Sequence, residues 1–469
     1  MKLPAAIKID STTSWLRSVP DHWQVRKLKH VADIRFSNVD KRTDDSEEIV
    51  FLCNYLDVYR NNKITLDIDF MPASADRAEI NKFALHVGDV LVTKDSERPD
   101  DIAIAAVVVE TKPNLLCGYH LALIRPAEDV LDGTFLNYLF ASKMFRLHFE
   151  TQANGVTRFG LSQDAFKNSV IPLPAIHEQR LIASFLDRET AKLDQLVEKK
   201  QRLIELLQEK RQALITQAVT KGLDPNVPMK DSGIPWLGEV PAHWDVWRLK
   251  HSIESLVNGV WGDEAQGDDN DTLCVRVADF NRRNFTVTLS NPTYRNVSLI
   301  DRQKRQINKG DLLLERSGGG DLHPVGFVVQ YQHDQKAICS NFISVLRPTQ
   351  RSFSSYFKYV HAMLYAFGVN RRSIKQTTGI QNFDAETYLN ELVPFPPYEE
   401  QVDIANFLEI ETKKIDDVIA NLEIQIEKIT EYRQALITAA VTGQIDVRQY
   451  VADEAMPVSS EQAAPSTLK

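Results

Sequence analysis

The chain has 469 residues, of which 43% are hydrophobic and 25% charged; this ordinary globular composition excludes a largely disordered or collagen-like chain. Its length exceeds that of one domain, so we expect roughly two to four domains. No long apolar run occurs inside the chain or after Met1, so we expect neither a membrane-spanning helix nor a secretory signal. The net charge of −9 argues weakly against a nucleic-acid partner but leaves room for a local basic surface.

The four cysteines, Cys53, Cys117, Cys274 and Cys339, are far apart, and no CxxC motif or Cys/His cluster accompanies them. This spacing favours neither a zinc site nor a disulfide framework, and it suits a reducing, cytoplasmic location. Each cysteine stands among apolar residues, so we expect all four in the core.

Two long stretches of the chain repeat one another in the same order. Residues 19–23 (Val-Pro-Asp-His-Trp) recur at 240–244 as Val-Pro-Ala-His-Trp, an offset of 221. From Gly88-Asp89 and Gly310-Asp311 onward the offset is 222, and residues 211–220 match 433–442 at nine of ten positions. A nearly constant offset with one inserted residue indicates a tandem duplication.

Each copy begins with a segment that contains both strand-like and helical patterns. Strand-like runs are expected at 102–109 and 121–124 in the first copy and at 311–314 and 327–330 in the second. Helical stretches are expected at 133–149 and 353–367, and proline-rich boundaries follow at 171–174 and 393–397. Each copy is therefore predicted to contain an α/β domain.

A long helix is expected to follow each α/β segment, because 178–219 contains no proline or glycine, and Gly222 and Gly443 are suited to end the two helices. Apolar residues recur every seven positions along each helix. The predicted seam comprises Leu186, Leu193, Leu207 and Leu214 in the first helix, with Lys200 in the same row, and Leu408, Ile415, Leu422, Ile429 and Leu436 in the second. Ile182, Leu196 and Leu203 lie three or four positions from this seam, and Ile404 and Val418 lie beside it, so they are predicted to form a second row. The two helices are predicted to form an intramolecular coiled coil; the alternative is that each packs on its own domain.

Further apolar residues of the two predicted helices lie outside this seam. They are Phe185, Ile204, Leu206, Ile215, Phe407, Ile424 and Ile426. We interpret them as a surface for partner subunits, with contact to the chain's own domains as the alternative.

Three motifs resemble catalytic signatures without completing them. Pro99-Asp100 with Glu110-Thr111-Lys112 has the order of a PD…ExK nuclease, but the equivalent stretch at 330–332 lacks both the carboxylate and the lysine. Residues 291–294 (Asn-Pro-Thr-Tyr) lack the second proline of the adenine-methyltransferase loop, and 317–320 (Ser-Gly-Gly-Gly) lack the Lys-Ser/Thr of a P-loop. We interpret the first motif as a strand between surface charges, the second as a turn and the third as a loop. We therefore expect no catalytic or metal site.

The order and doubling of the short motifs resemble the specificity subunit of type I DNA restriction-modification enzymes. The matching segments are 234–244, 173–179, 399–401, 88–91, 310–313 and the two Arg-Gln-Ala-Leu-Ile-Thr blocks at 211–216 and 433–438. Together they cover nearly the whole chain except its last residues.

The resemblance implies an α+β fold: two repeated α/β target recognition domains joined by two long helices, which form an antiparallel intramolecular coiled coil with pseudo-twofold symmetry. We expect recognition domain 1 at 1–175, spacer helix 1 at 176–222, linker and recognition domain 2 at 223–396, spacer helix 2 at 397–447 and a disordered tail at 448–469.

The function implied by the resemblance is non-catalytic. The subunit would read a bipartite, asymmetric target in double-stranded DNA, one half-site per domain, and would dock two methyltransferase subunits and the restriction/translocase subunits on its helices. S-adenosylmethionine, ATP and Mg²⁺ would belong to those partners. The alternatives are a nuclease or methyltransferase with fused recognition domains, and a coiled-coil adaptor that binds only proteins.

Candidate DNA contacts lie in loops that mix hydrogen-bond donors and acceptors, as reading base edges requires. They are Lys94, Ser96, Arg98, Thr157 and Arg158 in the first copy and Arg316, Ser317 and Gln381 in the second. Arg371, Arg372 and Lys375 form a basic run suited to phosphates, and a second run comprises Arg282, Arg283, Arg302, Lys304 and Arg305. For each of these residues the alternative is a solvated surface charge.

Overall fold

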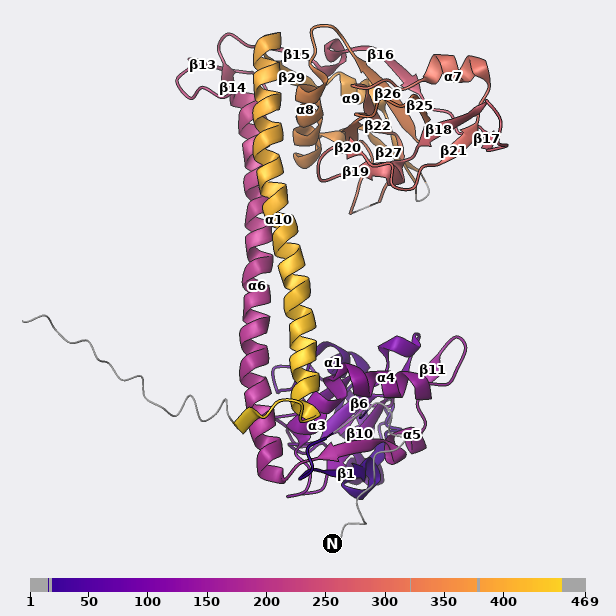
Figure 1. The fold of residues 1–469 in the computed structure, drawn as a ribbon, viewed down its shortest axis with the longest axis vertical. Coiled ribbons are helices and arrows are strands. Elements are labelled where there is room, and N and C mark those ends of the chain that lie inside the picture. Colours follow the sequence, from indigo (N-terminus) through magenta and orange to yellow (C-terminus); the bar gives the residue numbers. More distant parts are fainter. Residues whose placement is uncertain (1–15, 17–18, 321, 378–379, 449–469) are drawn as a thin grey trace, which may run out of the picture. The chain divides into compact units, whose positions relative to one another are not determined.

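The computed structural model describes residue 16 and residues 19–320, 322–377 and 380–448. These residues divide into two units: unit 1 holds the described residues up to 199 together with 425–448, and unit 2 holds 200–424. Each unit contains one α/β domain and a piece of both long helices (Figure 1). Residues 449–469, almost all of the tail expected to be disordered, lie outside the described residues.

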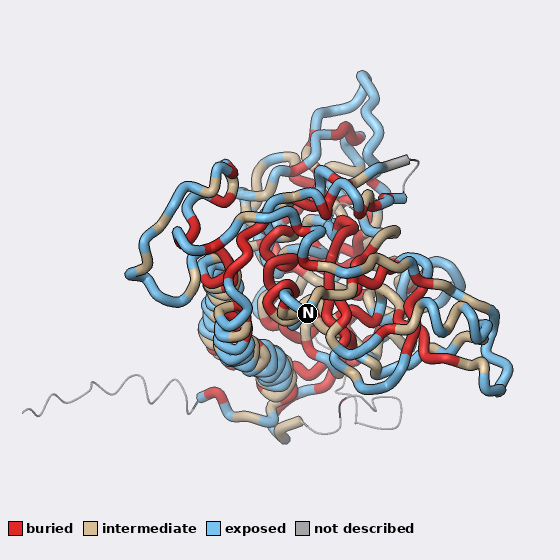
Figure 2. The backbone as a smooth tube through the Cα atoms, turned by 90° about the horizontal axis from the view of Figure 1, so that it is seen from above, coloured by how far each residue is buried: buried red, intermediate tan, exposed pale blue. Residues whose placement is uncertain are grey.

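The two long helices are α6 (Ile176–Lys221) and α10 (Tyr398–Val441). Both end before a glycine with positive φ, Gly222 at 75° and Gly443 at 72°, a backbone conformation that glycine adopts without strain. Figure 2 shows long exposed stretches on these helices, whereas the buried residues gather in the α/β domains. Packing therefore covers only part of each helix.

Within each unit, a piece of α6 lies beside a piece of α10. In unit 1, Leu186 of α6 shares an apolar cluster with Ile437 of α10, and Arg433 Nε lies 2.9 Å from Asp194 Oδ1. In unit 2, Ile215 shares a cluster with Leu408. In both units the beginning of one helix meets the end of the other, so the paired pieces run antiparallel.

The seam between the helix pieces follows a heptad pattern. All nine residues assigned to its first row are buried or half-buried. The residues four positions after first-row residues are also buried or half-buried; they are Thr190, Val197, Ile204, Thr412, Ile419 and Ile426. Leu196, Leu203 and Val418 are exposed, so their assignment to the second row was wrong by one residue. The sequence misled because these three apolar residues stand directly before Val197, Ile204 and Ile419, the positions that are buried or half-buried.

The α/β domain of unit 1 is built on a five-stranded sheet and a three-stranded sheet. The larger has the order β2 (Ala32–Phe36), β10 (Leu121–Pro126), β6 (Val90–Thr93), β8 (Ala105–Val108), β4 (Lys63–Ile64), and the smaller has the order β5 (Met71–Ala75), β3 (Glu48–Cys53), β9 (Leu115–Cys117). Two further pairs are β1 (Gln24–Lys27) with β12 (Val170–Leu173) and β7 (Asp95–Ser96) with β11 (Phe159–Gly160). The helices are α1 (Tyr55–Arg60), α2 (Arg77–Phe83), α3 (Gly133–Ala141), α4 (Lys143–Gln152) and α5 (Gln163–Asn168).

Unit 2 repeats this plan with sheets that contain more strands. They have the orders β16 (Ile253–Asn258), β26 (Ile343–Pro348), β22 (Leu312–Glu315), β24 (Val328–Gln330), β20 (Thr286–Val287), β19 (Phe280–Asn281); β17 (Asp263–Glu264), β21 (Tyr294–Asn296), β18 (Asp271–Val275), β25 (Ala337–Cys339); and β23 (Ser317–Gly318), β28 (Ile380–Phe383), β27 (Ile374–Thr377). The pairs are β13 (Met229–Asp231) with β14 (Glu239–Pro241) and β15 (Asp245–Arg248) with β29 (Leu392–Phe395). The helices are α7 (Leu299–Arg305), α8 (Ser354–Ala366) and α9 (Ala385–Leu389).

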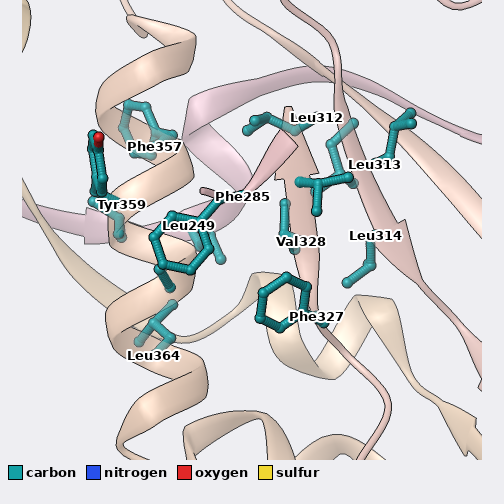
Figure 3. Packing of buried hydrophobic residues seen from close by; sticks show 14 of the residues in the cluster. Leu249, Phe285, Leu312, Leu313, Leu314, Phe327, Val328, Phe357, Tyr359 and Leu364 are labelled. Atoms are coloured by element: carbon teal, nitrogen blue, oxygen red, sulfur yellow. The ribbon is translucent and has the colours of Figure 1, made fainter. Parts of the chain in front are cut away.

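The core of unit 2 lies between the central strands and α8. Figure 3 shows Phe357 and Leu364 of α8 on the side of the sheet where Leu312 of β22 and Val328 of β24 lie. All four side chains are almost fully buried. Removing this much apolar area from water is the main stabilising contribution to such a domain.

The duplicated motifs anchor equivalent parts of the two units. The Asp of each Gly-Asp motif pairs with an arginine: Arg125 Nη2 lies 2.7 Å from Asp89 Oδ2, and Arg347 Nη2 lies 3.2 Å from Asp311 Oδ2. The Gln179 side chain, wholly buried at the start of α6, donates to two backbone carbonyls and accepts from one backbone N–H. Gln401 makes the same three contacts at the start of α10.

The four cysteines are free thiols in the core, as their apolar surroundings predicted. Burial raises the pKa of each, to about 12 for Cys274. The thiols are therefore held in their unreactive protonated form.

Candidate nucleic-acid interface

In unit 1, the loop before β11 brings two of the predicted DNA contacts beside β7. Asn154 and Gly160 exchange backbone hydrogen bonds of 3.0 and 2.9 Å that close the loop. Gly155 within it has φ of 146°, and a Cβ there would collide with the carbonyl oxygen of Arg158. The tight loop thus requires glycine, and it carries Thr157 and Arg158.

The carboxylate of Asp95 is the centre of this region. Arg158 Nη2 donates to its Oδ1 at 2.8 Å, and His120 Nδ1 lies 3.0 Å from its Oδ2. The Asp95 side chain is 19% exposed and that of Arg158 is 58% exposed. A recessed carboxylate therefore holds a cation that protrudes into solvent.

Lys94 is held by aromatic rings. Its Nζ lies 4.8 Å from the centroid of the Tyr119 ring and 5.2 Å from that of Phe36. Burial lowers the pKa of Lys94, and no carboxylate among the described residues lies within ion-pair distance of it. The ring faces and the nearby charge of Asp95 therefore both stabilise the positive charge.

A pocket beside this loop gathers the other first-copy candidates. Ser96, Arg98, Thr157 and Arg158 line it, together with tyrosines of α1 that sequence reasoning missed. Tyr59 donates a 2.9 Å hydrogen bond to Asp101. The Asn-Tyr-Leu-Asp sequence at 54–57 was the available signal, because an Asn followed three residues later by Asp is a helix-capping pattern.

The equivalent region of unit 2 is the sheet of β23, β28 and β27. Ser317 of β23 donates to the Asn382 side-chain oxygen of β28 at 2.9 Å, and Lys375 of β27 is the neighbour of Asn382 on the other side. Gln381 is buried and accepts a 3.2 Å bond from the backbone N–H of Val325. Asn382 points to the opposite, exposed face, as strand alternation requires, and sequence reasoning missed it.

The remaining second-copy candidates occupy the flanks of this sheet. Arg316, directly before β23, is half-buried. Arg371 and Arg372 are exposed in the short 3-10 helix Val369–Ser373, with Arg372 Nη1 3.9 Å from Glu391. Lys375 Nζ lies 2.7 Å from Asp384.

The second basic run anchors the domain of unit 2 internally. Arg282 pairs at 2.7 Å with Glu315, which is 2% exposed, and Arg283 pairs at 2.6 Å with Glu423 of α10. Burial raises the pKa of the Glu315 carboxyl, and the Arg282 charge opposes this shift. Arg302 and Arg305 donate to backbone carbonyls of neighbouring loops.

The residues of the nuclease-like motif have separate partners. Asp100 pairs with Arg98, Glu110 accepts from the backbone N–H of Leu66, and Lys112 lies 3.6 Å from the Phe51 ring centroid. Across the described residues, no group of three or more His, Cys, Asp or Glu side chains is placed to hold a metal ion. None of the described helices is both long and apolar enough to cross a membrane.

A model of the type I restriction modification DNA specificity domain matches residues 20–206 and 277–428, well over half of the chain. The chain belongs to this family. It is thus a type I restriction-modification DNA specificity subunit, of the non-catalytic class that the sequence predicted.

Relatives that align over most of their length, and solved structures, agree with this family assignment. A putative type I restriction enzyme MjaX specificity subunit of Methanocaldococcus jannaschii is 24% identical, over 92% of this chain and 95% of the relative. The EcoKI specificity subunit of Escherichia coli is 20% identical, over 89% of this chain and 88% of the relative.

Among solved structures, a chain from a study of type I restriction-modification complex assembly has a TM-score of 0.68 at 16% identity, covering 91% of this chain and 100% of its own length. The HsdS subunit from Thermoanaerobacter tengcongensis has a TM-score of 0.52 at 17% identity, covering 91% of this chain and 98% of its own. At such identities these structures support the shared fold, with its two α/β domains and two long helices.

Proposed function

We propose that this subunit reads a bipartite, asymmetric sequence in double-stranded DNA, one half-site with each unit. The observation that carries the proposal is a shared scaffold bearing different side chains. The β7–β11 pair of unit 1 and the β23–β28 pair of unit 2 occupy equivalent places in the fold.

Contacts inside the scaffold are retained between the copies. The Asp89–Arg125 pair recurs as Asp311–Arg347, and the Tyr138–Thr190 contact recurs as Tyr359–Thr412.

The side chains at and beside these strand pairs differ between the copies. At the constant offset of 222, Lys94 is replaced by Arg316, Asp95 by Ser317 and His120 by Phe342. Retained architecture with altered surface chemistry is what two readers of different half-sites need, because base identity is read through the donors and acceptors presented to the groove.

We further propose that residues 1–175 and 223–396 are the recognition domains and that the helices at 176–222 and 397–447 are the spacer between them. Both helices contribute to both units, so their length would set the separation of the half-sites.

The exposed faces of the helices support docking of methyltransferase subunits. In unit 2, large apolar side chains are exposed on both helix pieces; they are Leu203, Leu206, Phe407, Ile410, Val418 and Ile424. A run of exposed apolar residues is typical of a protein interface. The duplication supports two such subunits, one per copy. The restriction/translocase subunits would join this assembly, and S-adenosylmethionine, ATP and Mg²⁺ would be held by the partners. The free buried thiols are consistent with a cytoplasmic location.

The test is to produce the chain with the methyltransferase subunits of its own system and to map methylated adenines. Sequence-specific methylation at a two-part motif is expected, and random or no methylation would refute the proposal. Exchanging residues 25–170 for those of a relative should alter one half-site only. A change in both half-sites would refute the assignment of one domain to each half.

Docking is tested separately. Ile410→Asp and Ile424→Asp, both at exposed positions, should weaken copurification with the methyltransferase. Lys428→Asp, at an exposed polar position of the same helix, is the control. Unchanged copurification would refute docking on this face.

A further inference from the structure

The cluster of Asp95, His120 and Arg158 belongs to the first copy alone. In unit 2 the scaffold positions of Asp95 and His120 carry Ser317 and Phe342, neither of which can hold an arginine in this way. A feature that the duplication has not retained is not needed to build the shared scaffold. It is instead a candidate for what distinguishes one half-site from the other.

The geometry around Asp95 leaves Arg158 ready to bind a ligand. The hydrogen bond to Asp95 uses only Nη2 of the guanidinium, at 2.8 Å, and His120 Nδ1 lies 3.3 Å from the same nitrogen. Among the described residues, Nη1 and Nε of Arg158 have no hydrogen-bond partner. A guanidinium carries five N–H donors in a rigid plane, so donors remain available while one nitrogen fixes the direction of the group.

Asp95 is itself fixed in place. It begins β7, where it is the backbone partner of Gly160, and its second oxygen is occupied by His120. The His120 ring packs edge-on against Tyr119, with centroids 4.8 Å apart. The carboxylate thus acts as a rigid support that limits the rotamers of the exposed arginine, which lowers the entropy lost on binding.

From this arrangement, and resting on the proposed function, we infer that Arg158 reads a guanine in the half-site bound by unit 1 and that Asp95 is the residue that positions it. In the major groove, guanine presents two adjacent acceptors, O6 and N7, which a planar arginine contacts with two donors at once. Adenine presents a donor beside its acceptor, and a positively charged arginine has no acceptor to offer it.

The test uses the complex with its methyltransferase subunits, S-adenosylmethionine and a pool of duplex DNA with randomised positions; sequencing of the methylated molecules yields the motif. The wild-type complex should require guanine at one position of the unit 1 half-site. Arg158→Ala should lower discrimination at that position by about tenfold to a hundredfold. Arg158→Lys, which keeps the charge but not the planar fork, should relax the same position.

Asp95→Asn tests the positioning role, because it removes the charge but keeps an oxygen that can accept from Arg158. It should relax the same position by a smaller factor than Arg158→Ala. A merely structural role would instead lower methylation at all sites without changing the base preference. Arg77→Ala, at an exposed position of α2, is the control and should leave the motif intact.

The unit 2 half-site serves as an internal folding control, since it should be read unchanged by every variant. A wild-type complex that yields no two-part motif would refute the proposed function and this inference together. A wild-type two-part motif that Arg158→Ala leaves unchanged, or relaxes at a position other than guanine, would refute the inference alone.

Discussion

Two of the ion pairs between α6 and α10 allow an internal comparison, because the same chemistry occurs twice in different surroundings. Arg211 and Asp416 lie 3.1 Å apart with side chains 11% and 17% exposed, whereas Arg433 and Asp194 lie 2.9 Å apart with side chains 25% and 56% exposed. Arg211→Ala would leave a largely buried carboxylate without its partner, which costs about 3 kcal/mol or more. Arg433→Ala would leave Asp194 in contact with water, which costs about 1 kcal/mol or less.

For a unit of this size, about 3 kcal/mol corresponds to a loss of roughly 6–12 °C in Tm, and about 1 kcal/mol to at most roughly 4 °C. Thermal unfolding gives the overall shift. Hydrogen exchange of peptides covering 404–419 and 182–197 assigns the loss to unit 2 or unit 1. Equal destabilisation by the two substitutions would refute the reasoning, since only burial distinguishes the two pairs.

The pH dependence supplies a second readout of the same prediction. Burial raises the pKa of Asp416, and the charge of Arg211 opposes this shift. Without Arg211 the pKa of Asp416 rises further in the folded state, so the folded chain binds more protons than the unfolded chain. Stability of Arg211→Ala should then fall as pH rises from the unfolded aspartate value, about 3.9, through the raised folded value. The Tm difference from the wild type should be smaller near pH 4 than near pH 8, and a pH-independent difference would contradict this account.

Three further predictions follow from single residues. Gln179→Ala should lower the free energy of unfolding by about 3 kcal/mol, because it leaves one buried and two half-buried backbone groups without their protein partners; denaturant unfolding measures this, and a loss under about 1 kcal/mol would contradict it. Gly155→Ala should weaken reading of the unit 1 half-site while Tm stays nearly unchanged, since the collision is confined to one exposed loop; an unchanged methylation motif would count against the role of that loop. Cys117 should resist iodoacetamide at pH 8 in the folded chain and react after unfolding, because burial raises its pKa; mass spectrometry detects the adduct, and rapid labelling of the folded chain would be the contrary result.

Periodicity and duplication were sufficient to predict the repeated α/β domains, the two long helices and the buried cysteines. The helix at 133–149 is instead two helices, α3 and α4, because Ser142 lies between them in an extended conformation. A serine in a helical pattern does not reveal this break, since its choice between helix and cap depends on neighbours distant in the sequence.

The candidate site was predicted less completely than the fold. The loops carrying Lys94 and Arg158 could be found from their composition, but the Asp95 carboxylate that joins Arg158 to His120 depends on contacts across 63 and 25 residues. Asn382 was missed because only strand pairing reveals that it, and not Gln381, faces outward. Local patterns carry no information on such pairings.

The sharing of helix pieces has a consequence for synthesis on the ribosome. Unit 2 is one continuous segment, so all of its residues are available while the last part of the chain is still being translated. Unit 1 must wait, because the apolar residues Ile182, Phe185 and Leu186 share a cluster with Ile437 and Ala440, which are translated after all of unit 2. The half of the molecule that is made first is therefore completed second, and a prematurely terminated chain would expose Ile182, Phe185 and Leu186 to chaperones and proteases.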